Sequence, residues 1–275
     1  MVLPGGILRD GARRRDFAFR PLTGAVELAL ADATGVDSSL PTKVTAALVA
    51  TLEHVGGEPP LPATVAALSV GDRQFLMGRL AVGLGLGESW LTAVCGRCGE
   101  RFDFSVDYRD LPVKEAGEGY PLAEVETSVG PCSFRVPTGA DQEILAGLDD
   151  SEAFRSLLGR CLVAPTGPEG DGSSRGEKAD GFTPDDAARI ETALEAVAPE
   201  VAVSVQAACP ACGTPHGIDV DPYRVLSHQT AGGLLQEIHI LASAYHWSEA
   251  EILALPLKRR RSYLDLIDRS RGMAR

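Results

Sequence analysis

Two cysteine pairs of the form Cys-x-x-Cys-Gly constrain this chain more than any other feature of its sequence. The first pair lies in Cys95–Gly99 and the second in Cys209–Gly213. In each copy a valine follows the second cysteine by eight positions and an aspartate follows it by nine. These residues are Val106 and Asp107 in the first copy, and Val220 and Asp221 in the second. The sequence therefore predicts an internal repeat of the unit strand, knuckle, strand.

The spacing of these cysteines favours metal binding. A glycine directly after each pair lets backbone amides turn toward both sulfurs, which stabilises thiolates. One knuckle supplies two ligands, so two knuckles complete a tetrahedral shell. We predict one structural Zn²⁺ per chain, bound by Cys95, Cys98, Cys209 and Cys212. The 110 residues between the knuckles would form an insertion whose ends the metal joins. A redox dithiol and a pair of knuckles without metal are the alternatives.

The remaining cysteines and the rest of the sequence indicate no catalytic site. Cys132 and Cys161 belong to no motif and are expected to be small core residues. A closed shell of four thiolates has no open coordination position for water or substrate. Because no other motif pairs a nucleophile with a base, we predict a non-enzymatic protein without a small-molecule substrate.

The alternation of helical and strand-like segments predicts an α+β fold. Helical N- and C-terminal parts surround a small antiparallel β region with a zinc-ribbon-like four-cysteine site. A hydrophobic content of 44% is enough to form a core. The predicted parts are a basic N-terminal arm (1–20), a helical region (21–88), the first zinc knuckle with its β region (89–136), helices (137–164), a disordered loop (165–181), a helix with the second knuckle hairpin (182–222) and a C-terminal helical region (223–275).

The net charge of −12 is unevenly distributed. The last twenty residues hold seven Lys or Arg against two Asp, whereas the middle of the chain is acidic. An acidic body repels the phosphates of nucleic acid. The knuckle hairpins also carry Asp103 and Asp219 where a nucleic-acid-binding ribbon would carry basic residues. A zinc-ribbon nucleic-acid-binding or regulatory protein is kept as the alternative function. No apolar run reaches the roughly 18 residues of a membrane span, and no secretory leader is evident, so we expect a cytoplasmic protein.

The C-terminal region has the composition of a protein-binding surface. An apolar stripe leads to an aromatic corner, and a capped helix and a basic helix follow. The basic residues are either a solvated helix face or a dock for an acidic partner, and Trp, Tyr and Arg are the residues that interface hot spots favour. We predict a partner-binding surface made of Tyr245, Trp247, Arg259, Arg260 and Arg261.

Several stretches together resemble a known family. They are Arg20–Gly24 with Glu27, Leu68–Arg73, the two knuckles and the C-terminal run Leu234–Ile267. The chain resembles the baseplate hub assembly chaperones of T-even-like contractile phages and their relatives in extracellular contractile injection systems. This resemblance implies a role in assembling a baseplate hub, retention in the particle as an option, and hub, spike or wedge proteins as partners. It implies no catalytic residues.

Overall fold

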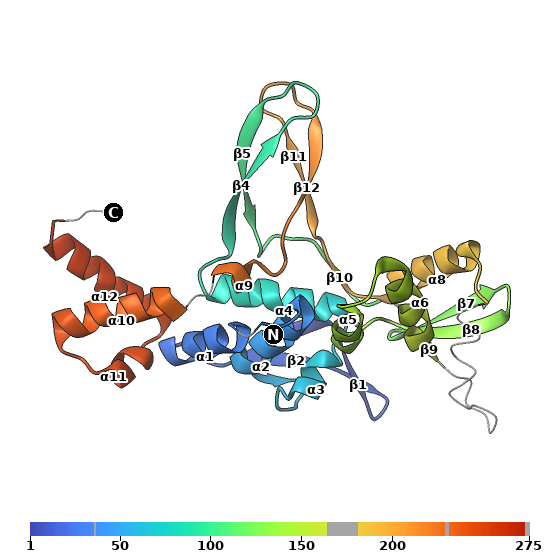
Figure 1. The fold of residues 1–275 in the computed structure, drawn as a ribbon, viewed down its shortest axis with the longest axis horizontal. Coiled ribbons are helices and arrows are strands. Elements are labelled where there is room, and N and C mark those ends of the chain that lie inside the picture. The colour runs from blue at the N-terminus through green and yellow to red at the C-terminus, as the bar shows by residue number, and fades with distance from the viewer. Residues whose placement is uncertain (36, 164–180, 229–230, 273–275) are drawn as a thin grey trace.

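The computed structural model describes residues 1–35, 37–163, 181–228 and 231–272. It is an α+β structure with a helical body, from which a stalk of two β-hairpins rises (Figure 1). A lobe of helices and strands lies on one side of the body, and three C-terminal helices lie on the other (Figure 1). The segment predicted as a disordered loop, 165–181, falls outside the described residues except for Gly181. In the described part of the chain, no helix combines the length and apolarity needed to cross a bilayer.

The predicted basic N-terminal arm, residues 1–20, forms a β-hairpin that packs in the body. Strands β1 (Val2–Arg9) and β2 (Ala12–Phe19) pair antiparallel around a turn in which Asp10 and Gly11 have positive φ. Leu3 and Phe17 are fully buried in the core of the body. Although this segment is rich in arginine, its few apolar residues determine its structure because they are buried in the core.

The body consists of helices that pack on this hairpin. Its elements are α1 (Gly24–Thr34), α2 (Leu40–Thr51), β3 (Leu52–Val55), α3 (Pro62–Ala66), α4 (Val70–Gly83), α5 (Gly139–Leu145) and α9 (Arg224–His228). Helix α2 ends at Thr51, and the next residues form β3, which pairs with β2 and completes a three-stranded sheet. The predicted helical region, 21–88, contains α1 to α4 and also this strand.

Two buried charged residues at the start of α4 connect the parts of the body. The Asp72 carboxylate accepts hydrogen bonds from the amides of Gly5 and Gly6, at 2.7 and 2.9 Å, and burial raises its pKa. The Arg73 guanidinium is fully buried and donates to the Pro41 carbonyl and the Thr45 hydroxyl, at 2.7 and 2.8 Å. The start of α4 is thereby bonded to both β1 and α2.

The lobe is built on a small sheet. Its elements are β7 (Leu122–Thr127), β8 (Gly130–Arg135), β9 (Leu162–Val163), α6 (Asp150–Cys161) and α8 (Pro184–Val197). Thr183 caps α8, and Pro184 is its first residue. The lobe is connected to the stalk through the pairing of β6 (Val113–Lys114) with β10 (Glu200–Val201).

A buried carboxylate secures the junction between the lobe and α5. Asp141 is fully buried and accepts hydrogen bonds from Arg135, at 2.6 and 2.8 Å, and from Arg160, at 2.8 Å. Thr138, the residue that caps α5, donates to the same carboxylate. Burial alone would raise the pKa of Asp141, but the bonds from Arg135 and Thr138 outweigh it and hold the pKa well below its usual range.

The C-terminal helices form a separate small core against α1. They are α10 (Ala231–Tyr245), α11 (Glu249–Leu253) and α12 (Leu257–Ser270). Ser248 and Glu251 form a reciprocal capping box at the start of α11. The backbone of Leu257 donates to Leu22, which attaches the unit to the entry of α1. Their shared core contains Leu234, Ile238, Leu241, Ile252, Leu264 and Ile267.

Candidate metal centre

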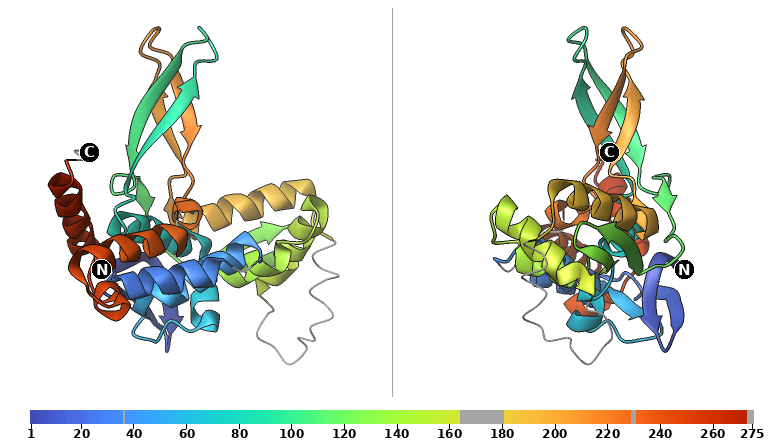
Figure 2. Two further views of the ribbon diagram at one scale, coloured as in Figure 1. Left: turned by 60° about the vertical axis from the view of Figure 1, so that its left-hand side comes forward. Right: turned by 90° about the vertical axis from the view of Figure 1, so that its right-hand side faces the viewer.

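The stalk consists of two β-hairpins that are far apart in the sequence and lie side by side in every view of the molecule (Figures 1 and 2). The first hairpin is β4 (Glu88–Val94) with β5 (Arg101–Asp107), and the second is β11 (Ser204–Ala208) with β12 (Pro215–Asp219). Each pairs antiparallel, with a knuckle at its tip. The predicted repeat of strand, knuckle, strand is confirmed.

The repeated valine and aspartate mark the base of each hairpin. Val106 and Val220 are both buried in one shared cluster. Asp107 accepts the amide of Arg109 at 2.8 Å, and Asp221 accepts the amide of Tyr223 at the same distance. Each aspartate therefore turns the chain in the same way as it leaves the stalk.

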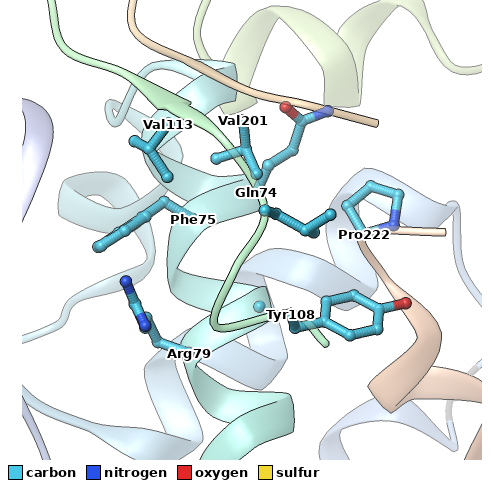
Figure 3. A pocket seen from close by; sticks show the side chains of 9 residues that line it. Gln74, Phe75, Arg79, Tyr108, Val113, Val201 and Pro222 are labelled. Atoms are coloured by element: carbon cyan, nitrogen blue, oxygen red, sulfur yellow. The ribbon is translucent and has the colours of Figure 1, made fainter. Parts of the chain in front are cut away.

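The two bases meet on α4. The Tyr108 hydroxyl donates to the Asp221 carbonyl at 2.5 Å, which bonds one hairpin to the other. Figure 3 shows Tyr108 and Pro222 beside Gln74, Phe75 and Arg79 of α4, around a cavity of about 10 Å³. A cavity of that size has room for about one water molecule. It is a packing gap at the foot of the stalk, too small for a ligand.

Equivalent hydrogen bonds shape the two knuckles. The amides of Cys95 and Gly99 donate to Glu100 and Cys95, at 2.8 and 2.9 Å. In the second knuckle, the amides of Cys209 and Gly213 donate to Thr214 and Cys209, at 2.9 and 2.8 Å. Gly99 and Gly213 have φ values of 75° and 72°, a conformation that glycine adopts without strain. The glycine after each pair is thus required by the turn that brings its two cysteines together.

The four predicted cysteines converge at the tip of the stalk. The sulfurs of Cys95, Cys98, Cys209 and Cys212 all lie within 4.8 Å of one another. The Sγ atoms of Cys95 and Cys212 are 3.6 Å apart, and those of Cys98 and Cys209 are 3.7 Å apart. The first cysteine of each knuckle therefore faces the second cysteine of the other, as an approximate two-fold axis requires.

This arrangement fits a tetrahedral metal ion with thiolate ligands. Metal–sulfur bonds of about 2.3 Å place the sulfurs of such a site about 3.8 Å apart. The two measured separations are close to that value. Cys95 and Cys209 are buried, while Cys98 is exposed. Four thiolates at this spacing fit Zn²⁺. The neighbouring residues bury the side chains of Cys95 and Cys209.

Hydrogen bonds prepare some of these thiols for ionisation. The amide of Cys98 lowers the pKa of Cys95, and the hydroxyl and amide of Thr214 lower the pKa of Cys212 to about 6. The amide of Glu100 lowers the pKa of Cys98, but the Cys95 and Cys212 sulfurs raise it more, to about 12. Four crowded sulfurs cannot all carry negative charge unless a cation neutralises them.

Two side chains beside the sulfurs break the symmetry of the site. Nε2 of His216 lies 3.2 Å from Sγ of Cys95, and Oγ1 of Thr214 lies 3.2 Å from Sγ of Cys212. The counterpart of His216 in the first knuckle is Phe102, four positions after the second cysteine, and the two rings are in contact. The contact of His216 with Cys95 was not predicted from the sequence, although His216 and Phe102 share the same offset from their cysteine pairs.

The other two cysteines lie in the lobe, away from the stalk. Cys161 is buried in α6, and burial raises the pKa of its thiol to about 11. Cys132 is partly buried on β8, with its sulfur 3.7 Å from the Thr127 hydroxyl. Cys161 fits the expectation of a small core residue, and Cys132 packs at the margin of the same core.

The aromatic residues predicted to bind a partner form one cluster. The rings of Tyr245 and Trp247 stack with centroids 4.7 Å apart, and Tyr263 meets Trp247 edge-on at 4.9 Å. The Arg259 guanidinium lies 5.9 Å from the centre of the Tyr263 ring. Arg259 and Arg261 are exposed.

Arg260 is the exception, because it does not belong to an exposed basic face. Its side chain is 1% exposed and forms ion pairs with Glu27 and Glu237. The neighbours on either side of Arg260 point outward, as the turn of a helix requires, whereas Arg260 points at α1 and α10. Its inclusion among the partner-binding residues is therefore wrong.

No protein-family model, curated protein or solved structure matches the chain. The resemblance to baseplate hub assembly chaperones stays a prediction.

Proposed function

We propose that the chain binds one structural Zn²⁺ through Cys95, Cys98, Cys209 and Cys212, in a composite zinc-ribbon-like site. The observation that supports this most is the convergence of four sulfurs from two hairpins whose facing cysteines are 111 and 117 positions apart. Zinc supplies the positive charge that lets all four thiols ionise together.

The metal would then act as a cross-link at the tip of the stalk. The hairpins are already joined at their bases by the bond from Tyr108 to Asp221. At the tip, the buried apolar contacts are few, and Phe102 is the main one. A cross-link that closes a loop of about 100 residues stabilises a fold by about 4.7 kcal/mol in chain-entropy terms. Zinc would hold together two ends that side-chain packing alone secures weakly.

We further propose that the protein is non-enzymatic and serves as an assembly factor or structural component of a contractile tail-like baseplate hub. A shell of four thiolates leaves no coordination position for a substrate. The stretches that carry the family resemblance also hold structural positions, since Asp72 and Arg73 organise the body and Glu27 holds Arg260. Hub, spike or wedge proteins with an acidic surface are the proposed partners of Tyr245, Trp247, Arg259 and Arg261.

Elemental analysis of protein purified without chelator tests the metal. We expect one zinc per chain, and a value near zero would contradict the proposal. The assembly role is tested separately by co-expression with baseplate components of the same gene cluster. The Arg259→Glu/Arg261→Glu variant should fold normally but lose co-purification. Retention of those components at the wild-type level would contradict docking through this surface.

A further inference from the structure

An apolar cavity of about 440 Å³ lies between α6 and α8, where the lobe meets the start of α4. Its walls include Phe154, Leu157 and Cys161 from α6, and Ile190 and Leu194 from α8, with Pro199 at one end. Cys161 and Ile190 are fully buried and form the floor, whereas Phe154 is 49% exposed. The cavity is thus a groove with an apolar floor that opens to solvent.

The packing of the lobe explains why the groove is open. Helix α8 packs against β7 and β8, while α6 packs against α5 and β9 (Figures 1 and 2). Each helix therefore covers a different part of the small sheet, and the start of α4, with Val70, Gly71 and Gln74, bounds the space that is left between them.

The groove continues along α8. A second cavity of about 730 Å³ shares Phe154, Leu158, Ala187 and Glu191 with the first. Together the two cavities follow α8 from Thr183 to Ala198. At 1.5 Å per residue this is about 22 Å, enough for a helix of about four turns.

The rim of the groove is acidic. Glu191, Glu195 and Glu200 are exposed at its edge. Among the residues that the structure describes, none of these three carboxylates forms an ion pair, and no Lys or Arg lines the 440 Å³ cavity, whereas Arg155 lines the second one. An occupant that complements the groove has an apolar face bordered by positive charge.

We propose that the groove between α6 and α8 binds an amphipathic helix of a partner protein, with an apolar stripe flanked by Lys or Arg. Helices dock in such grooves through apolar residues spaced at i, i+3 or i+4, and i+7. The elongated groove and the three exposed carboxylates along its 440 Å³ part favour this occupant over a compact ligand. The proposal is independent of the metal at the tip of the stalk.

Two synthetic helical peptides test the proposal. Both carry Leu at i, i+4, i+7 and i+11. One has Lys along the borders of the stripe, and the other has Glu at the same positions. Fluorescence anisotropy with the full zinc-loaded chain should show binding of the Lys peptide and at least about tenfold weaker binding of the Glu peptide, because like charges at an interface oppose binding. Binding of neither peptide, or equal binding of both, would overturn the proposal.

Two variants locate the binding site. The Glu191→Lys/Glu195→Lys variant changes exposed residues only, so it should fold normally and reverse the preference between the two peptides. Phe154→Ser should weaken both, whereas Ile144→Ser, at a similarly exposed position on α5, should change neither. An unchanged preference in the charge-reversed variant would place the peptide elsewhere and sink the idea.

Discussion

Nη2 of Arg260 lies 2.9 Å from both carboxylate oxygens of Glu27, a residue 233 positions earlier in the chain. Nε of the same guanidinium donates to Glu237 at 2.6 Å. The first helix of the body and two C-terminal helices are therefore connected through one buried side chain.

Replacing Arg260 should destabilise the fold far more than replacing its neighbours. Arg260→Ala leaves two carboxylates without their cation, and removal of one partner from a buried ion pair costs about 3–5 kcal/mol. Arg259→Ala and Arg261→Ala should each change the free energy of unfolding by less than about 0.5 kcal/mol. Urea denaturation of the three variants provides the comparison, and equal midpoints would refute the structural role of Arg260.

Removal of the proposed zinc should disorder the stalk and spare the body. Cys98→Ser and Cys212→Ser should each lower the zinc content to near zero and expose the hairpin amides to hydrogen exchange. The α4 amides should stay protected, because α4 is secured by Asp72 and Arg73.

Cys132→Ser is the matched control for this experiment, since its sulfur lies in the lobe. It should retain one zinc per chain. Loss of protection throughout the molecule in the Cys98→Ser variant would show that the stalk and body unfold as one unit.

His216 is expected to strengthen metal binding through its contact with Cys95. Side chains that hydrogen-bond a metal ligand typically contribute 10–100-fold to affinity. His216→Phe, which copies the counterpart Phe102, should weaken zinc binding by about that factor in competition with a chromogenic chelator. His216→Gln, which keeps an N–H donor, should recover part of the loss. Equal affinities for all three proteins would exclude this role.

Acid should remove the stabilisation that Asp141 provides. Its pKa is lower in the folded chain than the unfolded value of about 3.9. Its contribution is therefore complete at neutral pH, begins to be lost below about pH 5 and shrinks as pH falls toward the folded pKa. Asp141→Asn should cost about 2 kcal/mol at pH 7, because Arg135 and Arg160 are partly exposed and screened.

Urea denaturation at pH 7 and pH 3 measures this effect as the difference between wild type and variant. Taking the difference cancels the acid loss of metal, which both proteins share. If the difference in unfolding free energy between wild type and Asp141→Asn is the same at both pH values, the pKa of Asp141 does not change on folding.

The parts of the fold that local patterns control were predictable from the sequence. The knuckles follow from cysteine and glycine spacing, and the caps at Thr183 and Ser248 follow from residues within one helical turn. The convergence of Cys95 with Cys212 was predicted because a tetrahedral metal needs four ligands. Here a chemical requirement supplied the long-range contact that periodicity cannot supply.

Features that depend on distant partners were missed. The basic arm contains a strand because Phe17 is buried in the core of the body. Residues 52–55 are a strand and not a helix because they pair with β2. Arg260 looked like one of several exposed arginines until Glu27 and Glu237 were placed beside it. Nothing local distinguishes a buried arginine from its exposed neighbours.

The distance between the two knuckles has a consequence for biosynthesis. A ribosome adds about 5–20 residues per second, so about 5–20 s separate the emergence of Cys98 from that of Cys209, 111 positions later. During this interval the first knuckle offers only two of the four clustered cysteines, while the whole lobe is being translated. The two hairpins of the stalk can therefore meet only after all the residues between them have been synthesised.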